Sequence, residues 1–116
     1  PGYALYLYHL GLSEFRQGKY RDAAESFAAS TQGTLPTAEY DLQARYYLAR
    51  CLEELDEPEK AAEAEAQMAQ FGYGLEPLQK MIARQPDYAH LEQMRADLDD
   101  IAARLAEQKT LETAGS

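Results

Sequence analysis

Two runs of apolar residues at helical spacing flank Gly18 within residues 5–30. Before the glycine, Leu5, Tyr8 and Leu12 recur three to four positions apart, which is the spacing of one face of a helix. A second run follows the glycine. Because glycine accepts the left-handed backbone conformation that commonly ends a helix, the stretch predicts two antiparallel helices joined by a tight turn.

Small residues occupy the positions at which the two helices of such a hairpin would approach each other. Gly11 lacks a side chain, and a larger residue there would separate the helix axes, which pack about 8–10 Å apart depending on the side chains between them. Ala23 and Ala24 allow close docking of the second helix, and Phe27 fills the wedge before the next unit. We therefore expect Gly11 to be buried, together with Ala49, which takes the same place in the second helical unit described below.

This pattern resembles the tetratricopeptide repeat, a helix–turn–helix unit of about 34 residues that stacks into a solenoid. Leu10-Gly11 matches the Leu-Gly pair of the family motif, and Ala23 with Phe27 matches its Ala-x3-aromatic pair. The departures from the motif are Leu7 in place of Trp, Glu14 in place of Tyr, and Pro36 as a closing proline one residue late. The resemblance implies an all-α superhelix that binds other proteins.

A second unit extends from about position 38 to position 70. One constant displacement relates it to the first unit, so that Ala49 takes the place of Gly11 and Glu65 takes the place of Phe27. An unpaired carboxylate inside a solenoid would be costly. We therefore expect either that the following segment packs differently at Glu65, or that this side chain reaches solvent or a cation.

Loop and turn residues separate these helices. Residues 31–37 carry Gly, Pro and three Thr and predict a loop, with Thr37 as the N-cap of the next helix. Asp56-Glu57-Pro58 predicts the second turn, because proline suits the first position of a helix.

We expect a degenerate third unit to follow, the alternative being a coincidental similarity of five residues. Residues 84–88, Arg-Gln-Pro-Asp-Tyr, echo residues 16–20, Arg-Gln-Gly-Lys-Tyr, at twice the repeat length of the family. We expect a short helix over about 75–85 and a long one over about 87–109. The predicted organisation is two hairpins in residues 1–72, then a degenerate third hairpin with a long capping helix and a frayed tail in residues 73–116.

The last predicted helix has two interpretations. Its apolar stripe follows a strict three-and-four spacing through Leu91, Met94, Leu98, Ile101 and Leu105. In the first interpretation the first half of the helix caps the second hairpin and the rest is solvated. In the second, Leu98, Ile101 and Leu105 form a short coiled coil with a second copy of the chain, giving a homodimer.

Composition and charge exclude several function classes. Ala, Leu, Glu, Gln and Arg dominate and Val is absent, which favours helices over sheets. The formal net charge of −9 disfavours nonspecific nucleic-acid binding, which needs Lys and Arg to replace counterions, and anionic membrane surfaces. No apolar run approaches the ~20 residues of a membrane span.

Cysteine usage and the N-terminal residues bear on the location of the protein. A single cysteine, Cys51, cannot form an internal disulfide, which favours a reducing compartment. Nothing in the sequence resembles a signal peptide, although the start at Pro1-Gly2 without Met leads us to expect a fragment of a longer protein. The resulting expectation is a cytoplasmic protein.

The sequence lacks the common motifs that carry chemistry. There is no glycine-rich phosphate loop, zinc-type spacing or Gly-x-Ser-x-Gly elbow. His9 and His90 are far apart in sequence, and Cys51 falls on a core position. The side chains of Asp97, Asp99 and Asp100 would point in different directions on a helix, so we expect them to form a solvated face and not a metal site. We therefore expect no enzymatic activity, no cofactor and no metal.

The resemblance implies a binding groove, because the concave surface of tetratricopeptide arrays is lined mainly by the first helix of each unit. The corresponding residues in this chain are Leu5, Tyr8, Leu12, Arg16, Gln43, Tyr46, Arg50 and Glu54. Family members that bind the acidic C-termini of chaperones use a clamp of Lys, Asn and Arg at positions that in this chain hold Tyr8, Leu12 and Tyr47. We expect no such chaperone binding.

Three functions follow from these features. The leading one is a non-catalytic interaction module that binds a peptide or helix of another protein in the groove. The second is a structural domain that self-assembles through the last helix or through exposed repeat ends. The third is a regulatory fragment of a larger protein.

Overall fold

The structure is a computed structural model that describes residues 2–69, 96–97, 99–104 and 106–107. It contains the helices α1 (Tyr3–Arg16), α2 (Tyr20–Thr31), α3 (Ala38–Glu54) and α4 (Pro58–Ala69). The described residues between 96 and 107 are also helical, and we call them the docked segment. Within the described part of the chain there is no strand, which confirms the expected all-helical class.

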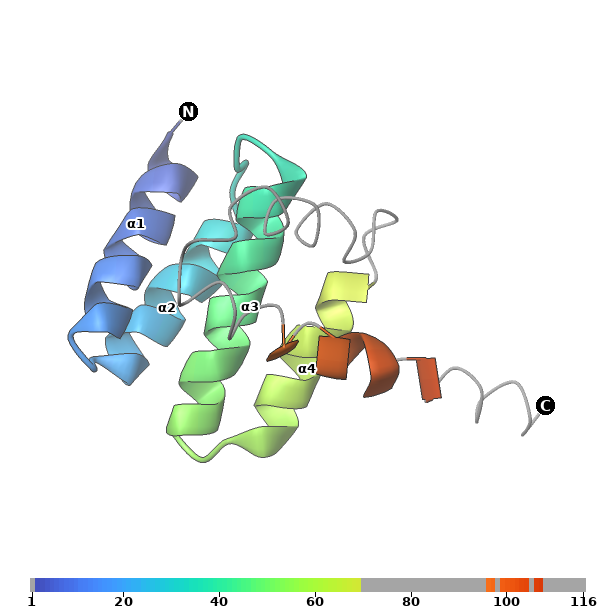
Figure 1. The fold of residues 1–116 in the computed structure, drawn as a ribbon. Coiled ribbons are helices and arrows are strands. Elements are labelled where there is room, and N and C mark those ends of the chain that lie inside the picture. Colours follow the sequence, from blue (N-terminus) through green and yellow to red (C-terminus); the bar gives the residue numbers. More distant parts are fainter. Residues whose placement is uncertain (1, 70–95, 98, 105, 108–116) are drawn as a thin grey trace.

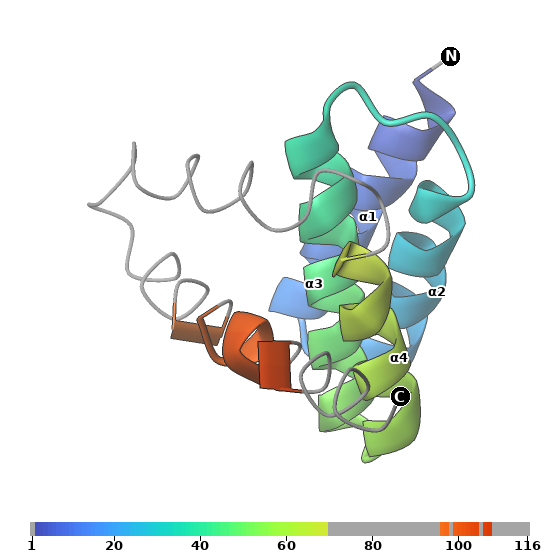
Figure 2. The ribbon, with the colours of Figure 1, turned by 90° about the vertical axis from the view of Figure 1, so that its right-hand side faces the viewer.

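The helices form two hairpins that lie side by side (Figure 1). Helix α1 packs on α2, α2 packs on α3, and α3 packs on α4, so α3 is the central helix. The docked segment lies across the lower part of the α3–α4 hairpin, and Figure 2 shows it beside the same two helices after a 90° turn. The predicted pairing of consecutive helices is therefore confirmed.

Other predictions fall outside the described residues. These are the third hairpin's first helix over 75–85, the first part of the helix over 87–109, and the tail. Only the docked segment of the last helix is described, so the predicted length of that helix stays a prediction. None of the described helices is both long and apolar enough to cross a membrane.

The first hairpin turn forms as its sequence predicts. Gly18 has a φ of +78°, in the left-handed region. The Lys19 N–H donates to the Glu14 carbonyl at 2.9 Å, and the Gly18 N–H donates to the Phe15 carbonyl at 3.0 Å. This pair of bonds is the Schellman motif, which satisfies carbonyls that would otherwise have no partner at the end of a helix.

The second hairpin turn repeats this geometry without a glycine. Asp56 takes the place of Gly18, has a φ of +58° and is the one described non-glycine residue with a positive φ. The Glu57 N–H donates to the Leu52 carbonyl at 2.8 Å, and the Asp56 N–H donates to the Glu53 carbonyl at 3.0 Å. Pro58 then begins α4, as predicted. The two hairpins therefore share one turn design at the predicted displacement.

Gly11 lies against the ring of Phe27, where α1 meets α2. A Cβ atom at Gly11 would lie 2.9 Å from Cε1 of Phe27, closer than packed carbon atoms approach. Ala49 is likewise buried and packs with Ala61 and Ala64 between α3 and α4. The expected burial of Gly11 and Ala49 is confirmed.

Aromatic rings form the centre of the core. Phe27 is fully buried and stacks on Tyr47, with ring centroids 5.5 Å apart and planes 15° from parallel. Phe15 meets the same tyrosine edge-on at 5.3 Å, and Tyr8 meets Phe27 edge-on at 6.0 Å. Offset-stacked and edge-on rings interact favourably beyond their burial of apolar area, so these rings fix α1 and α2 against α3.

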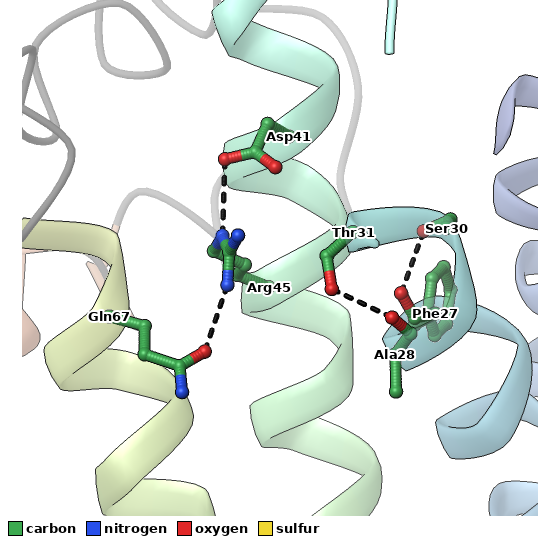
Figure 3. Close-up of polar contacts among 7 residues, drawn as sticks. All are labelled: Phe27, Ala28, Ser30, Thr31, Asp41, Arg45 and Gln67. Carbon is green, nitrogen blue, oxygen red and sulfur yellow. Dashed lines mark hydrogen bonds and ion pairs between the residues drawn. The ribbon is translucent and has the colours of Figure 1, made fainter. Parts of the chain in front are cut away.

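Polar side chains inside the fold have partners. Arg45 is buried on α3, and its guanidinium donates to Oδ2 of Asp41 at 3.1 Å and to Oε1 of Gln67 on α4 at 2.8 Å (Figure 3). Among the described residues, no buried side-chain nitrogen or oxygen lacks a partner. Arg45 therefore ties α3 to α4 without leaving a buried donor unpaired, which would be costly.

The end of α2 and the start of α3 are less regular than the turns. The hydroxyls of Ser30 and Thr31 donate to the carbonyls of Phe27 and Ala28, each at 2.7 Å (Figure 3). Thr37 is the N-cap residue of α3, as predicted, but its hydroxyl makes no capping bond to the helix. Thr37 has an extended backbone conformation, and the helix begins at the next residue without a side-chain cap.

Candidate protein-binding face

The four predicted groove residues of α1 lie at different depths. Leu5 and Leu12 are half-buried against the core, and Arg16 is exposed. Tyr8 is only 3% exposed, and its hydroxyl donates a 2.7 Å hydrogen bond to Oε1 of Gln43 on α3. Burial raises the pKa of the Tyr8 hydroxyl far above its ordinary value, so this group remains a donor. Tyr8 thus joins α1 to α3 and presents little surface to a partner.

The central groove residue of α3 is Tyr46, which is 1% exposed. Its hydroxyl donates a hydrogen bond to Oδ2 of Asp97 in the docked segment. The Arg50 guanidinium lies 5.0 Å from the centroid of the Phe15 ring and 5.9 Å from that of Tyr46, which places it for cation–π attraction to both. The other groove residues of α3 are Gln43, which is half-buried, and Glu54, which is exposed.

An open hollow lies between α1 and the start of α3, and we call it the α1–α3 hollow. It has a volume of about 470 Å³. Leu12 and Tyr40 supply apolar surface, and His9 and Glu39 supply polar groups. The residues that line it are Tyr8, His9, Leu12, Thr37, Glu39, Tyr40 and Gln43. Three of the predicted groove residues are thereby brought together.

On the second hairpin, the docked segment covers Tyr46 and Arg50. A cavity of about 150 Å³ remains between the hairpin and the segment, and we call the surface beneath the segment the α3–α4 cleft. Helices α3 and α4 contribute Tyr46, Ala49, Arg50, Glu53 and Glu65, and the docked segment contributes Asp97, Asp100, Ile101 and Arg104. The predicted groove residues Tyr46 and Arg50 therefore lie beneath the docked segment, whereas Leu12 lines the open α1–α3 hollow.

Glu65 is buried in this cleft and is paired with a cation. It is 6% exposed, and its Oε2 lies 3.0 Å from Nη1 of Arg104 while its Oε1 accepts a 3.4 Å hydrogen bond from Nη2. Arg104 also lies 3.2 Å from Oδ2 of Asp100. Both sequence-based alternatives for Glu65 thus hold in part, because the following segment packs over this side chain and supplies its cation. A two-point contact with arginine offsets the desolvation of the carboxylate.

A second carboxylate, Glu53, is affected by this arrangement. Its pKa is raised above the ordinary 4.5, first by burial, then by the nearby negative charge of Glu65 and a hydrogen bond with that side chain, and by Asp97. Arg104 opposes the shift. The lining of the covered cavity therefore holds four carboxylates, Glu53, Glu65, Asp97 and Asp100, and two arginines, Arg50 and Arg104.

The predicted self-association residues are only partly described. Ile101 is 3% exposed and packs into the same core cluster as Tyr46 and Tyr47. The side chains of Leu98 and Leu105 lie outside the described residues. The docked segment belongs to the second half of the predicted helix, which the first interpretation left solvated, so that expectation is wrong at Ile101, which points into its own chain. The half expected to cap the second hairpin lies mostly outside the described residues. The coiled coil with a second copy stays a prediction.

Sequence reasoning missed the contacts that the docked segment makes. The bonds from Tyr46 to Asp97 and from Arg104 to Glu65 join residues that are far apart along the chain. One signal was available, because Arg104 stands as far after Arg50 as Asp97 stands after Gln43. Two pairs at one spacing are too few to indicate a repeat in the sequence alone.

The described residues include one cysteine, Cys51, and one histidine, His9. Cys51 is fully buried, and burial raises the pKa of its thiol to about 12, so it stays protonated at neutral pH. His9 is exposed and meets the Tyr8 ring edge-on. Within the described ranges, no group of three or more His, Cys, Asp or Glu side chains could hold a metal ion. The α1–α3 hollow exposes an aromatic side chain, Tyr40, and a carboxylate, Glu39.

Comparison with known proteins adds no family to this description. No protein-family model matches the chain, and no curated protein or solved structure is significantly similar to it.

Proposed function

We propose that this chain is a tetratricopeptide-like interaction module, a short α–α superhelix that binds a helix or peptide of another protein and catalyses no reaction. Binding takes place on the face formed by the first helices of the two hairpins, α1 and α3. No nucleic acid, membrane or cofactor takes part. The free, buried Cys51 fits a reducing compartment such as the cytoplasm.

The observation that carries this proposal is the docked segment itself. A helical stretch of the same chain rests on Tyr46 and Arg50, which are groove residues of the second hairpin. Beside the first hairpin, the α1–α3 hollow is open and combines apolar surface from Leu12 and Tyr40 with polar groups. Concave, largely apolar surfaces with a few polar groups are the usual form of binding sites.

The α1–α3 hollow can be tested with a library of displayed helical peptides of about 16 residues, roughly four turns each. Peptides selected on the immobilised chain are then titrated by fluorescence anisotropy against the wild type and His9→Glu. This variant adds a carboxylate beside Glu39 at an exposed position of the hollow. Ala62→Glu is the matched control, because it adds the same charge to the exposed surface of α4.

The expected result is that His9→Glu weakens binding about tenfold or more, which corresponds to about 1.4 kcal/mol. Ala62→Glu should bind as the wild type does. Equal binding of the selected peptides to His9→Glu and the wild type would place the site elsewhere. A library that yields no binder would contradict the proposed function itself.

Self-assembly is a second candidate, favoured by the exposed end of α1. Tyr3 and Tyr6 are 71% and 58% exposed, and their rings stack with centroids 6.1 Å apart. Beside them lies a hollow of about 520 Å³ lined mostly by apolar surface from α1 and the end of α2. Sedimentation velocity over a wide range of concentrations tests this alternative. A monomer at every concentration would exclude it.

A further inference from the structure

The chain contains the same helix-to-helix interface twice. In the first copy, α1 and α2 contact α3, and in the second, α3 and α4 contact the docked segment. The displacement that relates Gly11 to Ala49 also relates Tyr8 to Tyr46 and Phe27 to Glu65. A second constant spacing relates α3 to the docked segment, so that Gln43, Tyr47 and Arg50 correspond to Asp97, Ile101 and Arg104.

The contacts at these equivalent positions match. The Tyr8 hydroxyl donates to Oε1 of Gln43 at 2.7 Å, and the Tyr46 hydroxyl donates to Oδ2 of Asp97. Tyr47 is buried in the first interface, and Ile101 takes its place in the second. The docked segment therefore occupies the position that the first helix of a following unit would occupy.

The chemistry of the two interfaces differs at the arginine. In the first, Arg50 lies over the ring of Phe15. In the second, the place of Phe15 holds Glu53, and Arg104 pairs with the buried Glu65. In the first interface the arginine therefore lies on an aromatic ring. In the second interface the arginine pairs with carboxylates. A buried carboxylate needs a hydrogen-bonded cation, so the α3–α4 cleft requires a cation at this point.

The docked segment is held by few buried side chains. Of its described side chains, Ile101 is buried and Asp97 and Ala102 are half-buried. Arg104 itself is about half exposed, with a side-chain exposure of 51%. Three side chains of the docked segment therefore contact the cleft: Asp97, Ile101 and Arg104. Their pattern is an acceptor oxygen, an aliphatic side chain four positions later, and an arginine three positions after that.

We propose that the α3–α4 cleft is a docking site for a partner helix that carries this acceptor–aliphatic–arginine pattern, and that the docked segment is its intramolecular occupant. The inference rests on the proposed function and specifies its partner: a helix whose arginine displaces Arg104 from Glu65. Such a partner competes with the chain's own segment. The partner helix therefore binds the wild type with lower affinity than it binds a chain whose docked segment cannot occupy the cleft.

The test uses the full chain and a labelled synthetic peptide with the sequence of residues 94–108. In Arg104→Glu, the new carboxylate faces Glu65 and Glu53 and repels the chain's own segment from the cleft. Arg104 is half exposed, so the core of the four helices should persist, which circular dichroism verifies. The peptide is titrated by fluorescence anisotropy into the wild type and into Arg104→Glu.

The expected result is that the peptide binds Arg104→Glu at least about tenfold more tightly than it binds the wild type. A peptide with glutamate in place of Arg104 should bind neither protein. In the double variant Glu65→Arg with Arg104→Glu, the segment regains its ion pair and the original peptide should again bind weakly.

Two results would overturn the inference. One is equal affinity of the peptide for the wild type and for a folded Arg104→Glu, including no binding to either. The other is a stable mixed dimer of wild type and Arg104→Glu in sedimentation, which would make a second copy the occupant instead of a partner helix. Neither result depends on the α1–α3 hollow, so failure here is distinguishable from failure of the proposed function with the peptide library.

Discussion

Replacing Gly11 by alanine should destabilise the protein, although alanine is the better helix former. Three atoms of the Phe27 ring, Cε1, Cδ1 and Cγ, would lie 2.9, 3.0 and 3.1 Å from the new Cβ. The ring cannot retreat easily, because Phe27 is fully buried, stacks on Tyr47 and meets Tyr8 edge-on. The helices α1 and α2 must therefore separate, or the aromatic cluster must shift.

The size of the effect follows from two opposing terms. Alanine is favoured over glycine inside a helix by about 1 kcal/mol. Forcing extra carbon atoms into a packed core costs about 1–3 kcal/mol, and the upper part of that range applies because the contact is with a fixed ring. The net loss for Gly11→Ala should be about 1–2 kcal/mol. For a domain of this size this corresponds to a fall in Tm of about 4–8 °C.

Urea unfolding followed by circular dichroism measures this loss, and a double-mutant cycle assigns its cause. In a Phe27→Leu background the ring atoms are gone, so Gly11→Ala should become neutral or stabilising by up to about 1 kcal/mol. A coupling energy of about 1–3 kcal/mol between the two positions is expected. If Gly11→Ala stabilises the wild type by the full helix-propensity term, the packing of α1 on Phe27 described above is wrong.

Three further substitutions test other parts of the structure. Asp56→Gly should raise stability by about 0.5–1 kcal/mol, because glycine adopts the left-handed conformation without strain; a lower Tm in thermal unfolding would contradict this. Glu53 has a raised pKa in the folded state, so its contribution to stability is present at low pH and is lost as pH rises through that pKa. Glu53→Gln should therefore stabilise by up to about 0.5 kcal/mol at pH 7 and have little effect near pH 4, and equal effects in urea unfolding at both pH values would count against the charge repulsion with Glu65. Tyr46→Phe removes the hydroxyl that donates to Asp97 and should cost about 1 kcal/mol in the same assay; an unchanged free energy of unfolding would show that the docked segment does not depend on this bond.

The hairpins could be predicted from the sequence because their signals are local. Helical spacing and the glycine at position 18 each describe neighbouring positions along the chain, and one constant displacement then relates the two units. That displacement placed Ala49 in the position of Gly11, and both are buried as expected. The same displacement relates Gly18 to Asp56, the second left-handed residue of the structure, although the sequence predicted only a turn at Asp56.

The depth of the groove residues could not be predicted in the same way. Helical spacing assigns Tyr8 and Tyr46 to a face, but it does not say what covers that face. Tyr8 is buried by Tyr40 and Gln43 at the start of α3, and Tyr46 is buried by the docked segment. Both depend on contacts between distant parts of the chain, and a tyrosine ring can enter a core while its hydroxyl keeps a partner at the edge.

Glu65 was the most informative departure of the second unit from the first, in which Phe27 holds the same position. Its position in place of Phe27 required either solvent, a cation or different packing, and the sequence alone left these open. The structure supplies Arg104 from a segment whose chain position gave no local indication of the contact. A departure from a repeat pattern thus marked the place where the second interface changes from aromatic to ionic.

The charge exchange between Glu65 and Arg104 tests most directly whether the docked segment packs on α3 and α4. Free energies of unfolding in urea are measured for the wild type, Glu65→Arg, Arg104→Glu and the double variant. Each single change should cost about 1–2 kcal/mol, less than for a fully buried pair because Arg104 is half exposed, and the double variant should recover most of the loss. Additive losses, with a coupling energy near zero, would contradict the docking of the segment and the repeated interface built on it.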